Sequence, residues 1–153
     1  MTYAVTVERI EPQPAATMRG TTTPAEIGPT LARILPAVGG QIFAQEVKPA
    51  GPPFCRYHSF SPERVDLEGG ITVQSEVQSA GDVQAIELPG GEVATTLHLG
   101  PYEKLGEAWD AMRAWFETEG REPAGPGWEV YLNDPGEVPD PQDYQTRIIW
   151  PVR

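Results

Sequence analysis

Apolar and polar residues alternate with two different periods along this chain, and each change of period marks a predicted element. Tyr3, Val5 and Val7 alternate with polar residues, which indicates a half-buried strand. Residues 15–19 resume the strand pattern after two prolines. A helical spacing follows, and its apolar positions are Ile27, Leu31, Ile34 and Val38.

Local signals predict where this helix begins and ends. Thr23-Pro24-Ala25-Glu26 places a threonine N-cap, a proline at the first helical position and a glutamate three residues after the cap, which is a capping box. Pro29 and Pro36 leave open that the helix starts late or is kinked, and Gly39-Gly40 predicts its end. Two strands are expected next, one over 54–60 and one within 66–77, and the turn at 79–82 is the predicted boundary between two halves.

The second half repeats the same order of elements. Residues 83–88 and 93–99 flank Pro89-Gly90-Gly91, which is typical of a hairpin or a bulge. A helix over 102–119 is predicted with Gly120 at its C′ position. Strands over 128–132 and 144–152 complete the half. The apolar stripe of this helix is Leu105, Trp109, Met112 and Phe116, and Trp115 lies beside it, where it could line the rim of a cavity.

The two halves are also similar in sequence. Pro49-Ala50-Gly51-Pro52 recurs as Pro123-Ala124-Gly125-Pro126, and the same offset aligns Phe54 with Trp128 and Tyr57 with Tyr131. We therefore predict an α+β fold, a single domain over 1–153 with duplicated β-α-β-β modules at approximately 1–78 and 82–153. A pseudo-two-fold axis would relate the modules, and the seam between them is a natural place for a pocket.

Composition excludes several classes of function. The chain has 153 residues and a formal net charge of −11, which disfavours nucleic acid and anionic membrane surfaces as partners. A single cysteine, Cys55, indicates a reducing compartment. The sequence begins without the pattern of a signal peptide and contains no apolar run long enough for a membrane span, so we expect a cytoplasmic protein.

Conventional catalytic motifs and metal-ligand spacings are missing from the sequence. Its softer ligands are Cys55, His58 and His98, which are not arranged as a zinc site, so we expect no metal and no cofactor. Cys55 and His58 are three residues apart on a predicted strand, where their side chains would point to opposite faces. We therefore interpret Cys55 as a buried structural residue, and His98 as a residue at the end of a strand.

An acidic residue among aromatic ones is the most informative candidate site. In the predicted strand over 128–132, Glu129 and Tyr131 share one face, which is turned either to solvent or to an internal cavity. By periodicity alone, a solvated Glu129 is the simpler interpretation. The repeat would bring Tyr57 and Tyr131 to one central site, and Glu68 is the second carboxylate candidate.

Several of these segments, read in order, resemble the GyrI-like small-molecule-binding family. The resemblance rests on the runs His98-Leu99-Gly100-Pro101-Tyr102, Ala108-Trp109, Pro123-Ala124-Gly125-Pro126 and Glu129-Val130-Tyr131-Leu132-Asn133-Asp134-Pro135. It continues through Phe54, Tyr57-His58 and the run 65–73, and so spans nearly the whole chain. These domains are the effector-binding parts of multidrug-sensing bacterial transcription regulators, and some are free-standing.

The resemblance implies two curved antiparallel sheets, two main helices and an aromatic cleft for a bulky, hydrophobic and often cationic molecule. The residues it assigns to ligand binding are Glu129, Glu68, Tyr57, Tyr131, Trp109 and Trp128. Many relatives carry Thr-Glu where this chain has Thr146-Arg147. Recognition of a cation would then depend on Glu129 or Glu68, or the ligand is not a cation.

Three functions are consistent with these residues. The first is a binding module for hydrophobic cations, which we expect to be free-standing because no DNA-binding segment precedes it, and to be a monomer or a homodimer. The second is a hydrolase of cyclopropane-containing DNA-alkylating compounds, with Glu129 as general base and Tyr131 or Tyr57 as hydrogen-bond donor. The third is an inhibitor of DNA gyrase that mimics the charge of DNA.

Overall fold

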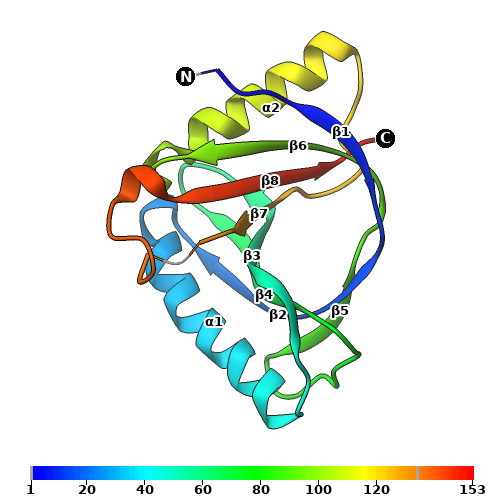
Figure 1. Ribbon diagram of the computed structural model, residues 1–153, viewed down its shortest axis with the longest axis vertical. Helices are drawn as coiled ribbons and strands as arrows, with labels where there is room; N and C mark the ends of the chain where they lie inside the picture. The colour runs from blue at the N-terminus through cyan, green and yellow to red at the C-terminus, as the bar shows by residue number, and fades with distance from the viewer. Residues whose placement is uncertain (1, 134) are drawn as a thin grey trace. The chain divides into compact units, whose positions relative to one another are not determined.

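The computed structural model describes residues 2–133 and 135–153 and has an α+β architecture of helices and antiparallel strands. These residues group into two units. We name them after their helices. The α1 unit is Glu11–Gly90, and the α2 unit consists of the residues up to Ile10 together with Gly91–Arg153. The chain is drawn in Figure 1.

The α1 unit is an antiparallel sheet with one long helix. In chain order it contains β2 (Gln13–Thr22), the 3-10 turn η1 (Pro24–Glu26), α1 (Ile27–Ala44), β3 (Pro49–Phe60), β4 (Val65–Val73) and β5 (Gln84–Leu88). The strands lie in the order β5-β2-β4-β3. The strands predicted over 15–19, over 54–60 and within 66–77 are therefore confirmed, although β3 begins earlier than predicted. The strand predicted from Tyr3, Val5 and Val7 begins only at Thr6, as β1 (Thr6–Ile10).

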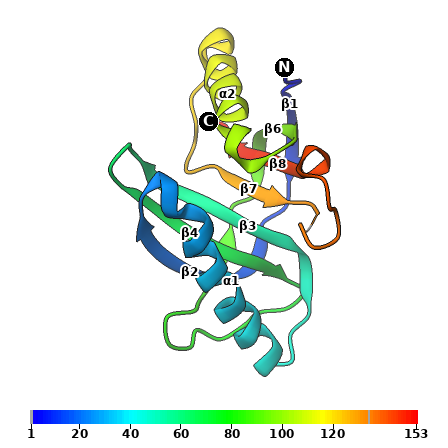
Figure 2. The same cartoon turned by 90° about the vertical axis from the view of Figure 1, so that its left-hand side faces the viewer.

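Helix α1 lies against β2 and β4 (Figures 1 and 2), and the sheet has a glycine at the point of closest approach. A Cβ atom on Gly69 would come within 2.8 Å of Ile34 and 3.0 Å of Leu31. The buried side chains of the helix are Leu31, Ile34, Val38 and Ile42. The apolar face of α1 thus packs on a strand surface that is locally free of side chains.

The predicted capping box and the predicted end of α1 are wrong, and the helix starts late, at Ile27. Among the described residues Thr23 makes no side-chain cap; its carbonyl oxygen instead accepts a hydrogen bond of 2.9 Å from the Glu26 backbone, and a 3-10 turn precedes the helix. Gly39-Gly40 does not end it, because Val38 and Ile42 on either side of this pair are both buried and keep the segment helical. The helix ends where Glu46 adopts a left-handed conformation with φ of 58°.

The α2 unit contains four antiparallel strands and one long helix. It contains β1 (Thr6–Ile10), β6 (Gly91–Leu99), η2 (Tyr102–Lys104), α2 (Leu105–Glu119), β7 (Trp128–Tyr131), η3 (Pro141–Asp143) and β8 (Gln145–Pro151). The strands lie in the order β1-β6-β8-β7. Gly120 caps α2 with φ of 64°, as predicted, because glycine adopts this conformation without strain.

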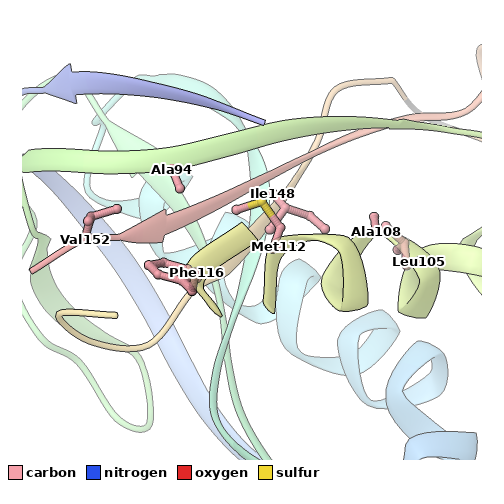
Figure 3. Packing of buried hydrophobic residues seen from close by; sticks show 7 residues of the cluster. All are labelled: Ala94, Leu105, Ala108, Met112, Phe116, Ile148 and Val152. Carbon is pink, nitrogen blue, oxygen red and sulfur yellow. The ribbon is translucent and has the colours of Figure 1, made fainter. Parts of the chain in front are cut away.

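The core of the α2 unit lies between α2 and the strands β6 and β8 (Figure 3). Its buried residues are Ala94, Leu105, Ala108, Met112, Phe116, Ile148 and Val152. The predicted stripe is confirmed at Leu105, Met112 and Phe116, but Ala108 rather than Trp109 completes it. Trp109 is only partly buried, and Trp115 packs edge-on against Phe116 with ring centroids 5.2 Å apart.

Strand pairing differs from the predicted order at two places. β5 pairs with β2, and β6 pairs with β1 and β8, so the predicted hairpin around Pro89-Gly90-Gly91 is wrong. The sequence repeat assigns β1 to the first half and β5 to the second. In the structure β1 instead pairs with β6 of the second half, and β5 pairs with β2 of the first half. The described helices are not long and apolar enough to cross a membrane. The pseudo-two-fold axis remains a prediction.

Candidate functional site

Glu129 is a buried carboxylate in β7 of the α2 unit. It lies in β7 directly opposite Ile148 of β8, and Ile148 belongs to the core beneath α2. Directly opposed residues of antiparallel strands point to the same face of the sheet, so Glu129 points towards α2. Its exposure is only 3%. The interpretation of Glu129 as a solvated strand residue is therefore wrong, because the face that it shares with Tyr131 is the one that α2 covers.

Two aromatic residues hold the Glu129 carboxylate. The indole Nε1 of Trp109 donates a hydrogen bond of 2.8 Å to Oε1, and the Tyr131 hydroxyl donates one of 2.7 Å to Oε2. Each carboxylate oxygen thus has a neutral donor, as a buried polar group requires. Three of the residues predicted for ligand binding therefore come together, and the helical turn that carries Trp109 brings it to the strand.

A series of aromatic rings continues on both sides of this carboxylate. Tyr102 meets Tyr131 edge-on at 5.7 Å between centroids and stacks on Tyr144 at 4.9 Å. On the other side Trp150 meets Trp109 edge-on at 5.1 Å. Aromatic rings provide large apolar surfaces with negative faces, so this arrangement suits a flat organic molecule or a cation.

Thr146 adds a polar atom without a hydrogen-bond partner to the same face. It lies in β8 between Tyr131 of β7 and His98 of β6 in register, and it is fully buried. Within the described part of the chain its hydroxyl has no hydrogen-bond partner. A buried hydroxyl left in this way costs about 1–3 kcal/mol, so it is a position where a ligand would gain a hydrogen bond.

His98 is fixed at the end of β6 by two contacts. Its Nδ1 lies 2.8 Å from the Tyr3 hydroxyl, and its Nε2 lies 3.0 Å from the carbonyl oxygen of Pro101. Burial, together with the negative charge of Glu107, raises the pKa of Tyr3 above its usual value. The prediction of His98 as a strand-end residue is confirmed, and its contacts connect the segment before β1 to the residue that precedes η2.

Glu68 is the second buried carboxylate, and its surroundings in the α1 unit are different. Its Oε1 accepts hydrogen bonds from Nε and Nη2 of Arg56 at 2.9 and 2.8 Å and lies 2.8 Å from Nε2 of His58. Its Oε2 accepts one of 2.7 Å from Thr17. Burial would raise the pKa of Glu68, but the hydrogen bonds from Thr17, His58 and Arg56 and the charge of Arg56 together lower it.

The structure places the remaining candidates elsewhere. Tyr57 lies opposite Leu67, on the other face of the α1 sheet from Glu68, and meets Phe60 edge-on at 6.0 Å. Trp128 is buried on the face of β7 opposite to that of Glu129. Cys55 is buried, as predicted. The meeting of Tyr57 and Tyr131 at one site remains a prediction.

Sequence reasoning missed Tyr102, Tyr144 and Thr146 as neighbours of Glu129, and Thr17, Arg56 and His58 as partners of Glu68. The alternation Arg56-x-His58 was the available signal, because two basic groups on one strand face suit a carboxylate on the next strand. No local pattern marked Thr146, whose environment depends on strand pairing between distant segments.

A family model for the GyrI-like small molecule binding domain matches residues 3–153. The chain belongs to this family. Its structure is similar to that of the EcmrR C-terminal domain, with a TM-score of 0.89 and 21% identity over 100% of this chain and 99% of that domain. In the EcmrR–DNA complex the TM-score is 0.87 at 20% identity, and the match covers 99% of this chain but 57% of the EcmrR chain.

Two further GyrI-like neighbours have different descriptions. SAV2435, solved bound to tetraphenylphosphonium, has a TM-score of 0.67 at 13% identity, with 100% of this chain and 94% of that chain covered. A hydrolase from Listeria innocua has a TM-score of 0.66 at 17% identity, with 97% and 91% covered. At such identities the similarity shows the fold alone. No curated protein matches this chain significantly.

Proposed function

We propose that this GyrI-like domain binds bulky, hydrophobic, cationic aromatic molecules, and that Glu129 is the acidic group that recognises their charge. The observation that supports this most strongly is the 3% exposed carboxylate of Glu129 held by the Trp109 indole and the Tyr131 hydroxyl. Membership of a family of small-molecule-binding domains supports ligand binding in general, and the geometry around Glu129 supports a cationic aromatic ligand.

The physical basis is the combination of a buried negative charge with aromatic faces. Removing a carboxylate from water costs several kcal/mol unless it is compensated. Trp109 and Tyr131 are neutral donors, so the hydrogen bonds that they give Glu129 do not cancel its negative charge. A ligand cation would bring a positive charge to this carboxylate, and each ring face would add about 0.5–2 kcal/mol through a cation–π contact.

The tetraphenylphosphonium ion named for SAV2435 is a cation of this class, with aromatic groups around a positive charge. Its rings would contact apolar and aromatic surfaces such as those of Trp109, Trp150 and Tyr102. The hydroxyl of Thr146 would favour ligands that also carry a hydrogen-bonding group. We also propose that a pseudo-two-fold axis relates two duplicated modules, as the sequence repeat indicates.

A dye titration tests the role of Glu129. Rhodamine 6G, a cationic aromatic dye, is titrated with the protein, and binding is measured by fluorescence polarisation. Glu129→Gln keeps the shape and removes the charge, and we expect the dissociation constant to rise about tenfold or more. Glu117→Gln on the exposed side of α2 is the matched control, with less than about a twofold change. Equal affinity in wild type and Glu129→Gln would overturn the proposal.

A hydrolase is the second candidate, because the same three residues could also act on a bound molecule, and one structural neighbour is described as a hydrolase. Glu129 would accept a proton from water, and the water oxygen would attack a carbon of a strained cyclopropane ring. The broken carbon–carbon bond would leave its electron pair on a conjugated carbonyl as an enolate. Tyr131 would donate a hydrogen bond to that oxygen before reprotonation.

Turnover distinguishes the two candidates. A cyclopropane-containing alkylating compound is incubated with protein at one-hundredth of its concentration, and the ultraviolet absorbance of the compound is followed. Complete conversion that Glu129→Gln abolishes would establish the hydrolase. Protection of a stoichiometric fraction without conversion would establish a binding protein.

A further inference from the structure

The sheet of the α2 unit has a second face, turned away from α2, and Arg147 lies on it. In β8, Thr146 and Ile148 face the helix, so Arg147 between them faces the other way. It is directly opposite Leu97 of β6 and Val130 of β7. This arginine is therefore separated from Glu129 by the thickness of the sheet.

Exposed apolar side chains surround Arg147 on this face. Leu97 is 38% exposed, and Leu99, two residues further along β6, is 48% exposed. Leu132 follows Val130 on the β7 side and is 37% exposed; its backbone N–H bonds the carbonyl of Gln145 at 2.9 Å. Large apolar groups gathered around one charge form an amphipathic surface, and such a patch often marks a binding site.

The guanidinium of Arg147 has unused hydrogen-bonding capacity. Its Nη1 donates one long hydrogen bond of 3.3 Å to Oγ1 of Thr95, and the side chain is partly buried. Throughout residues 2–133 and 135–153 no carboxylate forms an ion pair with it. A guanidinium carries five N–H donors in a planar fork that matches a carboxylate.

The surroundings of Arg147 differ from those of Arg56 in the α1 unit. Arg56 of β3 lies directly opposite Glu68 of β4, and the two side chains form an ion pair. Arg147 of β8 lies directly opposite Leu97 of β6 and Val130 of β7. A carboxylate thus stands beside Arg56, whereas apolar residues stand on both sides of Arg147.

We propose that Arg147 is the anion-binding group of a second ligand site, which takes an amphipathic organic carboxylate. The carboxylate would bind the guanidinium fork, and an aromatic or aliphatic body would lie on Leu97, Leu99 and Leu132. The charge of −11 opposes anion binding in general, so attraction must come from this local arginine.

Fluorescence titration with 1-pyrenebutyrate tests this proposal, with 1-pyrenebutanol as the uncharged probe of the same shape. We expect the carboxylate to bind more tightly than the alcohol. Arg147→Met should weaken carboxylate binding about tenfold or more, and Arg147→Lys about threefold, because lysine keeps the charge but loses the fork. Arg33→Met, at an exposed position of α1, removes the same charge elsewhere and should change the affinity less than about twofold.

Two further measurements make the test decisive. Thermal unfolding of each variant confirms that it folds, and Leu97→Ser should weaken both pyrene probes about equally if the apolar patch holds the ligand body. Glu129→Gln should leave pyrenebutyrate binding unchanged, because Glu129 belongs to the proposed cation site on the other face of the sheet. The proposal for Arg147 and the proposal for Glu129 can therefore fail independently of each other. Equal binding of acid and alcohol, equal affinity of wild type and Arg147→Met, or a dimer that covers Leu97 would each overturn the proposal.

Discussion

The molecule contains two buried glutamates of nearly equal exposure, 2% for Glu68 and 3% for Glu129, with contrasting neighbours. Glu68 is held by a guanidinium, an imidazole and a hydroxyl. Glu129 is held by an indole and a phenol. The ion pair with Arg56 makes the first carboxylate part of the framework of the sheet, whereas we propose that the second, which accepts hydrogen bonds from aromatic side chains, recognises a ligand. Burial alone therefore does not identify a functional carboxylate.

Removing the charge of Glu68 should have the largest effect. Glu68→Gln leaves the Arg56 guanidinium without a counter-charge in a site where its side chain is only 14% exposed. We expect the free energy of unfolding to fall by about 2–3 kcal/mol, somewhat below the loss for a fully buried pair. Urea unfolding followed by circular dichroism measures it. Glu76→Gln, at an exposed position, is the control and should change stability by less than about 0.5 kcal/mol.

Trp109→Phe should have a smaller effect on stability and a clear effect on binding. Phenylalanine keeps an aromatic ring but removes the Nε1–H that bonds Glu129. The expected loss of unfolding free energy is about 1–2 kcal/mol, because one carboxylate oxygen loses its donor. Trp115→Phe is the matched control on the same helix. If both variants bind rhodamine 6G with the affinity of the wild type, the proposed difference in function between Glu129 and Glu68 is contradicted.

Thr146→Val should stabilise the fold. Valine has nearly the same shape and removes the buried hydroxyl that has no partner among the described residues. We expect a gain of about 1 kcal/mol in the free energy of unfolding. Ligands that can hydrogen-bond should bind the variant more weakly, whereas tetraphenylphosphonium, which cannot, should bind it unchanged. A loss of stability would show that the hydroxyl already has a partner, such as an ordered water.

The pH dependence of stability should give the smallest difference. The pKa of Glu68 is lowered from its reference value of 4.5, so its ionised form stabilises the folded state above pH 4.5. This contribution is lost as pH falls from 4.5 through the lower pKa of the folded state. The stability difference between wild type and Glu68→Gln should therefore shrink in acid. A difference that stays constant from about pH 7 to about pH 3 would contradict the pairing.

Much of the local structure follows from sequence signals that packing reinforces. Helix α2 has a continuous apolar face and a glycine cap, and it forms as predicted with only Ala108 and Trp109 exchanged in role. The predicted C-terminal end of α1 is wrong because Val38 and Ile42 are both buried, which outweighs the preference of two glycines for a turn. Tertiary burial decided that boundary.

The candidate site was predictable in part. The alternation around Glu129 correctly paired it with Tyr131 on one face, but it could not say whether solvent or a helix covers that face. Trp109 was placed on the apolar stripe, whereas the structure turns its indole to the carboxylate. The surroundings of Thr146 and Arg147 depend on pairing of β8 with strands that are distant in sequence, and no short pattern predicts that pairing.

The exchange of β1 and β5 between the halves affects folding during synthesis and the folding of fragments of the chain. Thr6 must wait for Thr95 before its strand has a partner, so the amino-terminal segment leaves the ribosome long before its place in the sheet exists. A gene split at the turn after residue 79 would give two pieces, each carrying a strand that the other needs. Neither piece should fold alone, and mixing them should restore a native circular dichroism spectrum.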